Sequence, residues 1–237
     1  MLSGVQEWVG YRRGAFGDTV AVWSAGPDFE AVAARWAADP ALVESLLLHG
    51  IAARDPLAAE ALLHLPLSDR SREGFTKLLI ACLGTAAIGF HLSALEALHA
   101  LTSDESWSAE VVRVLEGSGF WGDRMEAARV LGGFRPTAGL IQSLSRAIVD
   151  PDYLVRRQVA NTLLVFGGRD ADISALPLVH DRIRSGTRPQ DWAIASIELT
   201  TQALLCADLS YAPLTDQSAP KQLPVIARGL TNALQSP

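Results

Sequence analysis

The sequence predicts an all-α fold, arranged as an α-solenoid of about five helix-turn-helix repeats. Apolar residues recur at three- and four-residue steps along most of the chain, as in amphipathic helices. Asp-Pro pairs at 39, 55 and 150 are typical helix starts. A short pattern, two small or apolar residues with leucine three positions after the second, recurs five times. Its copies begin at residues 58, 94, 127, 159 and 195, and the spacings of 36, 33, 32 and 36 residues match stacked helical hairpins.

Residues 1–27 are predicted to form an irregular N-terminal arm that lies on the first helices. Within it, residues 3–13 have the apolar spacing of a short amphipathic helix, and Thr19–Trp23 has the composition of a strand. A single strand has no partner to pair with, so an ordered loop is expected there. The arm is therefore predicted to contribute little regular structure.

The repeat domain is predicted over residues 28–206. Asp28, Asp39 and Asp55 are placed to cap its first three helices, because a carboxylate accepts hydrogen bonds from the free backbone N–H groups of a helix start. His49-Gly50 is expected to end the second of these helices. The following helices are expected near 69–83, 89–101, 107–116, 122–132, 136–149, 150–166, 171–185 and 189–206.

Residues 207–237 are predicted to be a linker and a C-terminal capping helix. Three prolines between 207 and 224 indicate extended chain. The last helix is expected over 225–235, because apolar and polar residues separate onto two faces there. The apolar face is formed by Val225, Ile226, Leu230 and Leu234, and the polar face by Arg228, Asn232 and Gln235.

The most strongly marked helix is the segment 150–166. Asp150 is expected to cap it, Pro151 to occupy its first turn, and Gly167-Gly168 to end it. One face carries apolar residues at helical spacing and must be buried. These residues are Leu154, Val155, Val159, Leu163 and Phe166.

Two segments, Asp123–Phe134 and Pro136–Val179, resemble HEAT repeats, especially the variety found in phycobilisome-lyase-like bacterial proteins. The residues that carry the resemblance are Asp152, Val155, Arg156, Val159, Ala160 and Leu163, preceded by a helix with Leu140, Leu144 and Ile148. The resemblance implies that the Asp152 and Arg156 positions form hydrogen bonds that link neighbouring repeats. Copies before residue 120 lack these positions and are predicted from spacing alone.

Composition predicts a folded protein of the reducing cytoplasm. The chain has 237 residues, 49% of them hydrophobic, and its two cysteines, Cys82 and Cys206, lie in apolar helical patterns where buried free thiols are expected. No leader or membrane-spanning stretch is predicted. The net charge of −6 disfavours nucleic acid as a partner, although residues 121–190 hold 10 basic and 7 acidic groups.

No catalytic constellation is predicted, and no cofactor or metal. The sequence lacks a Gly-rich phosphate loop, a His-Glu-x-x-His pair and a Gly-x-Ser-x-Gly turn, and its histidines are scattered. Asp150 and Asp152 beside Arg156 and Arg157 would permit acid-base catalysis, but capping and repeat-linking roles are favoured.

Aligning the five copies produces two columns of polar residues. The column two positions after each start holds Glu60, Glu96, Arg129, Asn161 and Ile197, and the column three positions before it holds Asp55, His91, Arg124, Arg156 and Trp192. Neighbouring helices pack about 8–10 Å apart, so Glu96 is predicted to pair with Arg129. These columns form either a solvated ladder or a polar groove that grips an acidic segment. The candidate partner-binding residues are Arg124, Arg129, Arg156, Arg157, Asn161 and Trp192.

The function predicted is a non-enzymatic protein–protein interaction module, of scaffold, adaptor or toxin-neutralising type, whose concave face binds a protein partner with an acidic segment. The alternative is a helical-repeat enzyme, either bilin lyase-like or DNA-glycosylase-like. A competing placement of the binding site is the acidic N-terminal repeats around Glu60 and Glu96.

Overall fold

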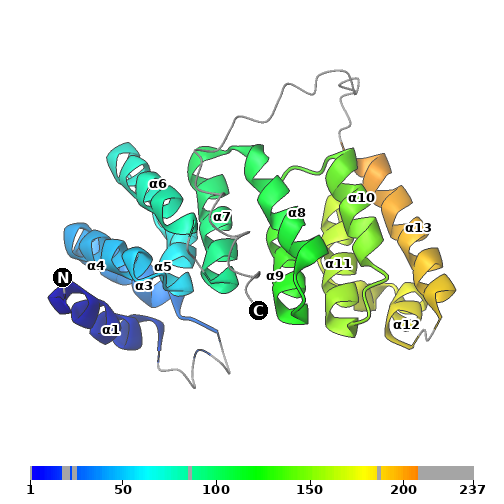
Figure 1. Cartoon of the computed structure of the whole chain (residues 1–237), viewed down its shortest axis with the longest axis horizontal. Helices are drawn as coiled ribbons and strands as arrows, with labels where there is room; N and C mark the ends of the chain where they lie inside the picture. Colours follow the sequence, from blue (N-terminus) through cyan, green and yellow to red (C-terminus); the bar gives the residue numbers. More distant parts are fainter. Residues whose placement is uncertain (1, 18–21, 23–25, 85–86, 186–187, 208–237) are drawn as a thin grey trace, which may run out of the picture.

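The computed structural model of the chain describes residues 2–17, 22, 26–84, 87–185 and 188–207. All regular structure in these residues is α-helix or short 3-10 helix, which confirms the all-α prediction. The helices follow one another along the long axis of the molecule, from α1 at one end to α12 and α13 at the other (Figure 1). The predicted strand at Thr19–Trp23 and the predicted C-terminal linker and capping helix lie outside the described residues, Val22 excepted.

The N-terminal end is built from α1 (Leu2–Phe16), α3 (Phe29–Ala38) and α4 (Pro40–Ala52). The short helix predicted over residues 3–13 is confirmed, but α1 is longer, with 15 residues, and packs on α3 and α4, so this part of the arm is not irregular. The physical reason is burial, since Trp8 and Phe16 are almost completely buried. Gly50 was expected to end α4 but lies inside the helix. The position has no room for a side chain, because a Cβ there would stand 2.7 Å from both the Trp8 ring and the Ala58 methyl group.

Five helical hairpins follow in the order of the chain. Their elements are α4 with α5 (Pro56–Ala61) and η1 (Leu62–His64), α6 (Asp69–Leu83) with α7 (Ile88–Thr102), η2 (Glu105–Trp107) and α8 (Ser108–Gly117) with α9 (Trp121–Leu131), α10 (Ala138–Ala147) with α11 (Tyr153–Phe166), and η3 (Ile173–Ala175) and α12 (Pro177–Ser185) with α13 (Pro189–Cys206).

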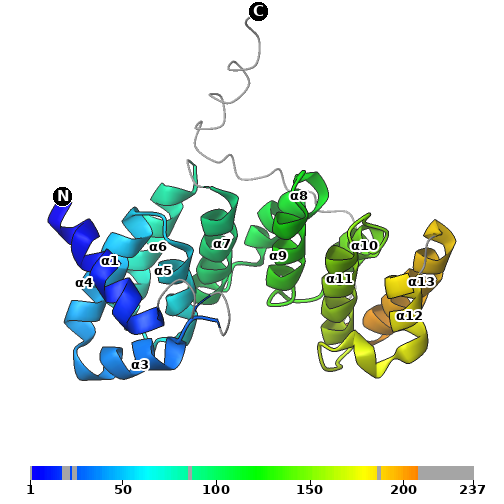
Figure 2. The ribbon, with the colours of Figure 1, turned by 90° about the horizontal axis from the view of Figure 1, so that it is seen from below.

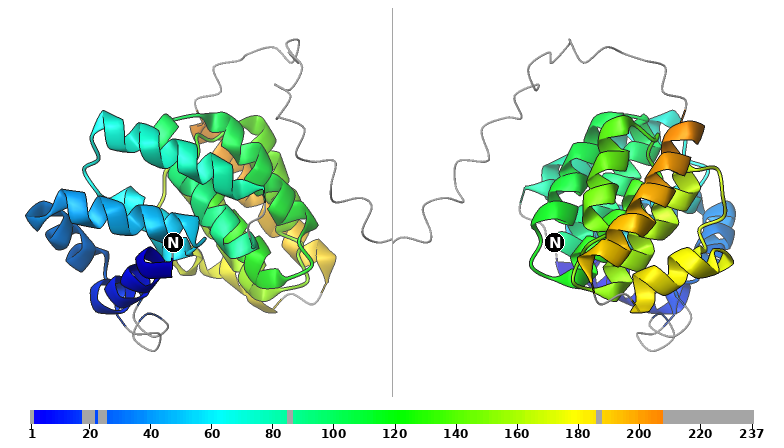
Figure 3. Two further views of the ribbon diagram at one scale, coloured as in Figure 1. Left: turned by 60° about the vertical axis from the view of Figure 1, so that its left-hand side comes forward. Right: turned by 90° about the vertical axis from the view of Figure 1, so that its right-hand side faces the viewer.

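Each second helix of a hairpin contacts the second helix of the next. The contacts run from α5 to α7, α9, α11 and α13 in turn, while α4 contacts α6 and α8 contacts α10 in the other row. Figures 2 and 3 show the two rows from below and from the side. The five copies of the sequence pattern fall on these five second helices. Their first residues are all fully buried, and so are their leucines apart from slight exposure at Leu62.

The helix starts follow the predicted capping at two Asp-Pro pairs but not at the third. Asp39 accepts a hydrogen bond from the backbone N–H of Leu42, and Asp55 from that of Leu57. At 150–152 the prediction was wrong by two residues, because Asp152 caps α11 and Asp150 is engaged elsewhere. Leu154, predicted to be buried, is 38% exposed as a result of its place in the first turn.

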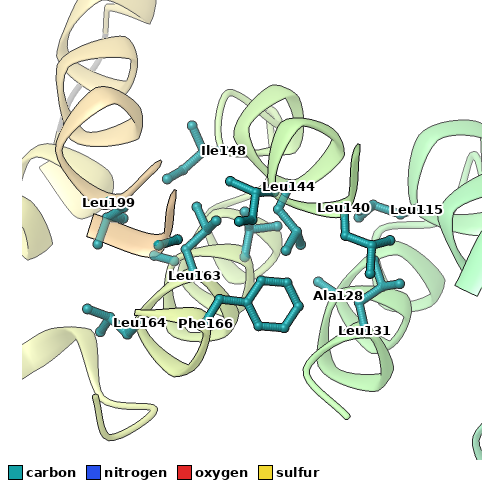
Figure 4. Packing of buried hydrophobic residues seen from close by; sticks show 14 of the residues in the cluster. Leu115, Ala128, Leu131, Leu140, Leu144, Ile148, Leu163, Leu164, Phe166 and Leu199 are labelled. Carbon is teal, nitrogen blue, oxygen red and sulfur yellow. The ribbon is translucent and has the colours of Figure 1, made fainter. Parts of the chain in front are cut away.

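Buried apolar side chains form two clusters that meet at α7. Phe90, Ala94 and Leu98 of this helix belong to the N-terminal cluster, and Leu92 and Leu95 belong to the C-terminal one. In the C-terminal cluster Leu163 and Phe166 lie between the helices of neighbouring hairpins (Figure 4). Trp107, at the start of α8, packs against both clusters. The cores of successive hairpins are therefore shared.

Leu163→Ala is expected to lower the free energy of unfolding by about 2–5 kcal/mol, because the leucine is fully buried between hairpins and its removal leaves a cavity. Urea unfolding followed by circular dichroism measures the change. Leu178→Ala is the control: its side chain is 74% exposed, so a change within about 0.5 kcal/mol is expected. Equal effects of the two substitutions would contradict the described core.

Candidate functional site

Arg124, one of the residues predicted to bind a partner, links two hairpins of the chain. Its Nε and Nη2 donate to the two carboxylate oxygens of Asp150 at 2.7 and 3.0 Å, and its Nη1 donates to the backbone oxygen of Ser118 at 2.9 Å. Its side chain is only 14% exposed. A two-pronged arginine–carboxylate contact of this kind is strong and fixes geometry. It joins α9 to the start of α11, which also explains why Asp150 does not cap that helix.

Arg156 is buried and links the last two hairpins. Its side chain donates to the backbone oxygen of Ile183 at 3.1 and 3.2 Å, and to those of Asp150 and Pro151 at 2.8 and 2.9 Å. Its guanidinium carbon lies 4.2 Å from the ring centroid of Trp192. The role in joining repeats that the resemblance implied for this position therefore agrees with its contacts in α12 and α13.

The six predicted partner-binding residues do not form one open groove. Arg124 contacts Asp150 in the next hairpin, and Arg156 lies over the ring of Trp192 in the hairpin after that. The Oδ1 atom of Asn161 accepts a hydrogen bond from the backbone N–H of Ile173 at 2.9 Å. This bond holds η3, and α12 consequently begins at Pro177 rather than near 171. Arg157 is exposed. These positions do not offer an acidic segment a continuous positive surface.

The structure instead shows an acidic hollow of about 370 Å³ that crosses three hairpins. Its walls come from α3, α5, η1, α7 and α9. The lining residues are Phe29, Glu60, Leu63, His64, Glu96, Glu126 and Arg129. The column of Glu60, Glu96 and Arg129 in the sequence thus lies along this hollow, as neighbouring second helices require.

Arg129 holds two of the three carboxylates in the acidic hollow. Its Nη1 and Nη2 donate to the two oxygens of Glu96 at 3.0 and 2.6 Å, and its Nε donates to Glu126 at 2.8 Å. The predicted pairing of Glu96 with Arg129 is confirmed. With Glu60 ionised, three negative charges face one positive charge, so the hollow has a negative potential.

Glu60 is the carboxylate in the hollow that Arg129 does not hold. Its Oε1 accepts a hydrogen bond from the hydroxyl of Ser93 at 2.9 Å, and no ion pair is formed with it by the described residues. Burial raises the pKa of Glu60, and the nearby charges of Glu126 and Glu96 raise it further, against the opposing effects of Ser93 and Arg129. A cation placed in the hollow would stabilise its ionised form.

An aromatic pair forms the other side of the hollow. The rings of Phe29 and His64 are stacked, with centroids 4.2 Å apart and an angle of 14° between their planes. Carboxylates and aromatic rings that line one hollow are a combination that accepts a guanidinium or ammonium group through ion pairing and cation–π contact. Among the described residues, no three His, Cys, Asp or Glu side chains are placed to hold a metal ion.

Sequence reasoning found part of the hollow and missed the rest. The repeat column marked Glu60, Glu96 and Arg129, and the acidic N-terminal repeats were the competing placement of the site. Phe29 and His64 carried no signal, because they reach the hollow from α3 and η1 through tertiary packing. They are separated in the sequence by 35 positions.

Comparison of the chain with protein-family models, with curated proteins and with solved structures finds no match. In the part of the chain that the structure describes, no helix combines the length and the apolar character of a membrane span. Cys82 is buried as predicted, but Cys206 is exposed at the end of α13.

Arg156→Ala is expected to reduce the free energy of unfolding by about 2–4 kcal/mol, because three buried or half-buried carbonyl oxygens lose their donor and the Trp192 ring loses its cover. Chemical denaturation measures this. The neighbouring exposed residue supplies the control, since Arg157→Ala is expected to change stability by no more than about 0.5 kcal/mol. Comparable losses in both variants would show that Arg156 has no special linking role.

Glu60→Gln is expected to stabilise the protein at neutral pH. Because the pKa of Glu60 is raised above its ordinary value of 4.5, its favourable contribution is complete below that pH and is lost as the pH rises through the raised pKa. Glutamine keeps the acceptor for Ser93 and cannot ionise. Urea unfolding at pH values about one unit apart between about pH 4 and 8 measures the free energy of unfolding of both proteins. The excess of the variant over the wild type should become smaller as the pH falls.

Glu73→Gln is the matched control with the opposite sign. The Lys77 ammonium group, which donates to Glu73 at 2.5 Å, lowers the pKa of this exposed carboxylate. The stabilisation that Glu73 contributes to the fold is complete above its ordinary pKa and is lost as the pH falls through the lowered pKa. If Glu60→Gln instead loses stability at neutral pH, as Glu73→Gln should, the described burial of Glu60 is incorrect.

Proposed function

We propose that the chain is a non-enzymatic protein–protein interaction module of the cytoplasm, an α-solenoid of HEAT-like repeats that binds a basic segment of a partner protein in the acidic hollow. The regular spacing of the five copies and the unbroken series of contacts from α5 to α13 support the repeat architecture. The single observation that carries the function is the acidic hollow itself, a site assembled from three successive hairpins.

The chemistry of the acidic hollow favours a positively charged occupant. Arg129 is fully engaged by Glu96 and Glu126, so Glu60 is the carboxylate left to receive a new cation. An arginine or lysine of the partner would place its charged end at Glu60 and its stem against Leu63 and the Phe29–His64 pair. The proposal thus replaces the acidic partner segment that the sequence predicted with a basic one.

The enzyme alternatives gain no support from this site. A DNA-glycosylase-like protein must approach phosphates, and a negative hollow repels them. A bilin carries propionate carboxylates, which the same charges would repel. No hydroxyl or thiol side chain is among the residues that line the acidic hollow.

The proposed function predicts that the double substitution Glu60→Gln with Glu126→Gln weakens binding of the partner more than tenfold, which corresponds to about 1.4 kcal/mol of binding free energy. Affinity capture with the wild type alone, read by mass spectrometry, selects the partner, whose binding to the wild type and to this variant is then compared. Calorimetric titration of the selected partner then gives the affinity. The affinity should also fall as the salt concentration rises, since exposed charges are screened over about 8–10 Å at physiological ionic strength.

Glu116→Gln is the control, because Glu116 is an exposed carboxylate of α8 that pairs with Arg146 away from the hollow. It removes one charge and should leave the affinity unchanged. A partner that binds the wild type and the double variant equally well would exclude the acidic hollow as the binding site.

A further inference from the structure

Helix α13 has two apolar faces, of which the hairpins of the array cover only one. Ala195, Leu199 and Ala203 are fully buried against the neighbouring helices α10 and α11. The opposite face carries four large aliphatic side chains at helical spacing, which we call the outer stripe. They are Ile194, Ile197, Leu204 and Leu205, with exposed fractions of 49%, 68%, 37% and 81%.

The outer stripe departs from the pattern of the other second helices. In the repeat alignment Ile197 occupies the column that holds Glu60, Glu96, Arg129 and Asn161 in the four preceding copies. Those residues are polar because their face meets solvent. The last helix carries isoleucine at this position although it stands at the end of the array (Figure 3, right). A terminal repeat needs a polar outer surface, so the stripe requires a cover.

The chain itself supplies a segment of matching character. Thirty residues follow Ala207, and 225–235 among them place apolar residues on one helical face. The 17 residues 208–224 can span up to about 55 Å, whereas α13, with 18 residues, is about 27 Å long. The segment 225–235 can therefore reach every part of the outer stripe.

We propose that residues 225–235 form a helix that covers the outer stripe, with Ile226, Leu230 and Leu234, which share one helical face, against Ile194, Ile197, Leu204 and Leu205. The chain's own segment is favoured over a second copy or another protein because a short tether gives it an effective concentration on the order of millimolar. It carries one charged residue, Arg228, on its polar side, so its apolar side opposes the stripe without a buried charge. This interaction is independent of the acidic hollow.

Digestion of the full-length protein with an arginine-specific protease tests the proposal, because Arg228 is the one arginine in the segment. Mass spectrometry follows the release of residues 229–237. Docking should protect this bond in the wild type. Ile197→Asp with Leu205→Asp, and separately Leu230→Asp with Leu234→Asp, should each accelerate the release at least tenfold by placing charges in the apolar contact.

Two controls carry aspartate outside the contact. Leu178→Asp changes an exposed leucine of α12, and Asn232→Asp changes the polar face of the segment, so both should behave as the wild type does. Circular dichroism checks that each variant keeps its helical signal. The tail variant removes no side chain from the described helices, so it stays informative if the α13 variant loses structure.

Release from the wild type as fast as from the variants would overturn the proposal. A dimer seen by light scattering that Ile197→Asp with Leu205→Asp dissociates, and Leu230→Asp with Leu234→Asp does not, would assign the stripe to a second copy and overturn it equally. Slow release in the wild type and in both controls, with fast release in both double variants, is the expected result.

Discussion

The fold depends on one constraint, the need of each second helix to bury its apolar face against the next one. Small side chains at a fixed position make this approach possible, since Ala58, Ala94, Ala127 and Ala195 are all fully buried where neighbouring helices meet. Polar groups follow the same constraint. The hydroxyl of Thr162 in α11, itself buried, donates to the backbone oxygen of Ala128 in α9 at 2.7 Å. The regular spacing of the copies along the chain therefore follows from the packing of each second helix against the next.

The two columns of the repeat alignment have separate physical roles. Three residues at the position three before a copy start link their hairpin to an adjacent element: Asp55 pairs with Arg12 of α1 at 2.7 Å, Arg124 with Asp150, and Arg156 with the α12 backbone and Trp192. Residues two positions after the start line a surface, and in the first three copies this surface is the acidic hollow. Residues of the first column join elements of the fold, and the second column is the one to which the proposed function assigns recognition.

Much of the fold could be predicted from the sequence because apolar spacing and helix caps are local signals. They located α13 at 189–206 without error and placed all five copies on buried helices. The failures come from tertiary contacts. Asp150 was expected to cap a helix, but its carboxylate is held by Arg124 from 26 positions away. The Arg124 and Arg156 side chains, which were predicted to bind a partner, are engaged by acceptors within the chain that charge alone does not reveal. The aromatic side of the hollow could not be predicted for the same reason.

Arg129 determines which carboxylate of the acidic hollow would receive the basic group of the proposed partner. Three carboxylates this close would repel one another and would tend to take up a proton, but Arg129 neutralises Glu96 and Glu126 through three hydrogen bonds. A basic group entering the hollow has no reason to displace an arginine that is already held on both sides. It meets Glu60 instead, whose burial disfavours its charge until a cation arrives. The hollow thus offers one defined position for a positive charge, beside the stacked Phe29 and His64 rings, rather than a diffuse acidic surface.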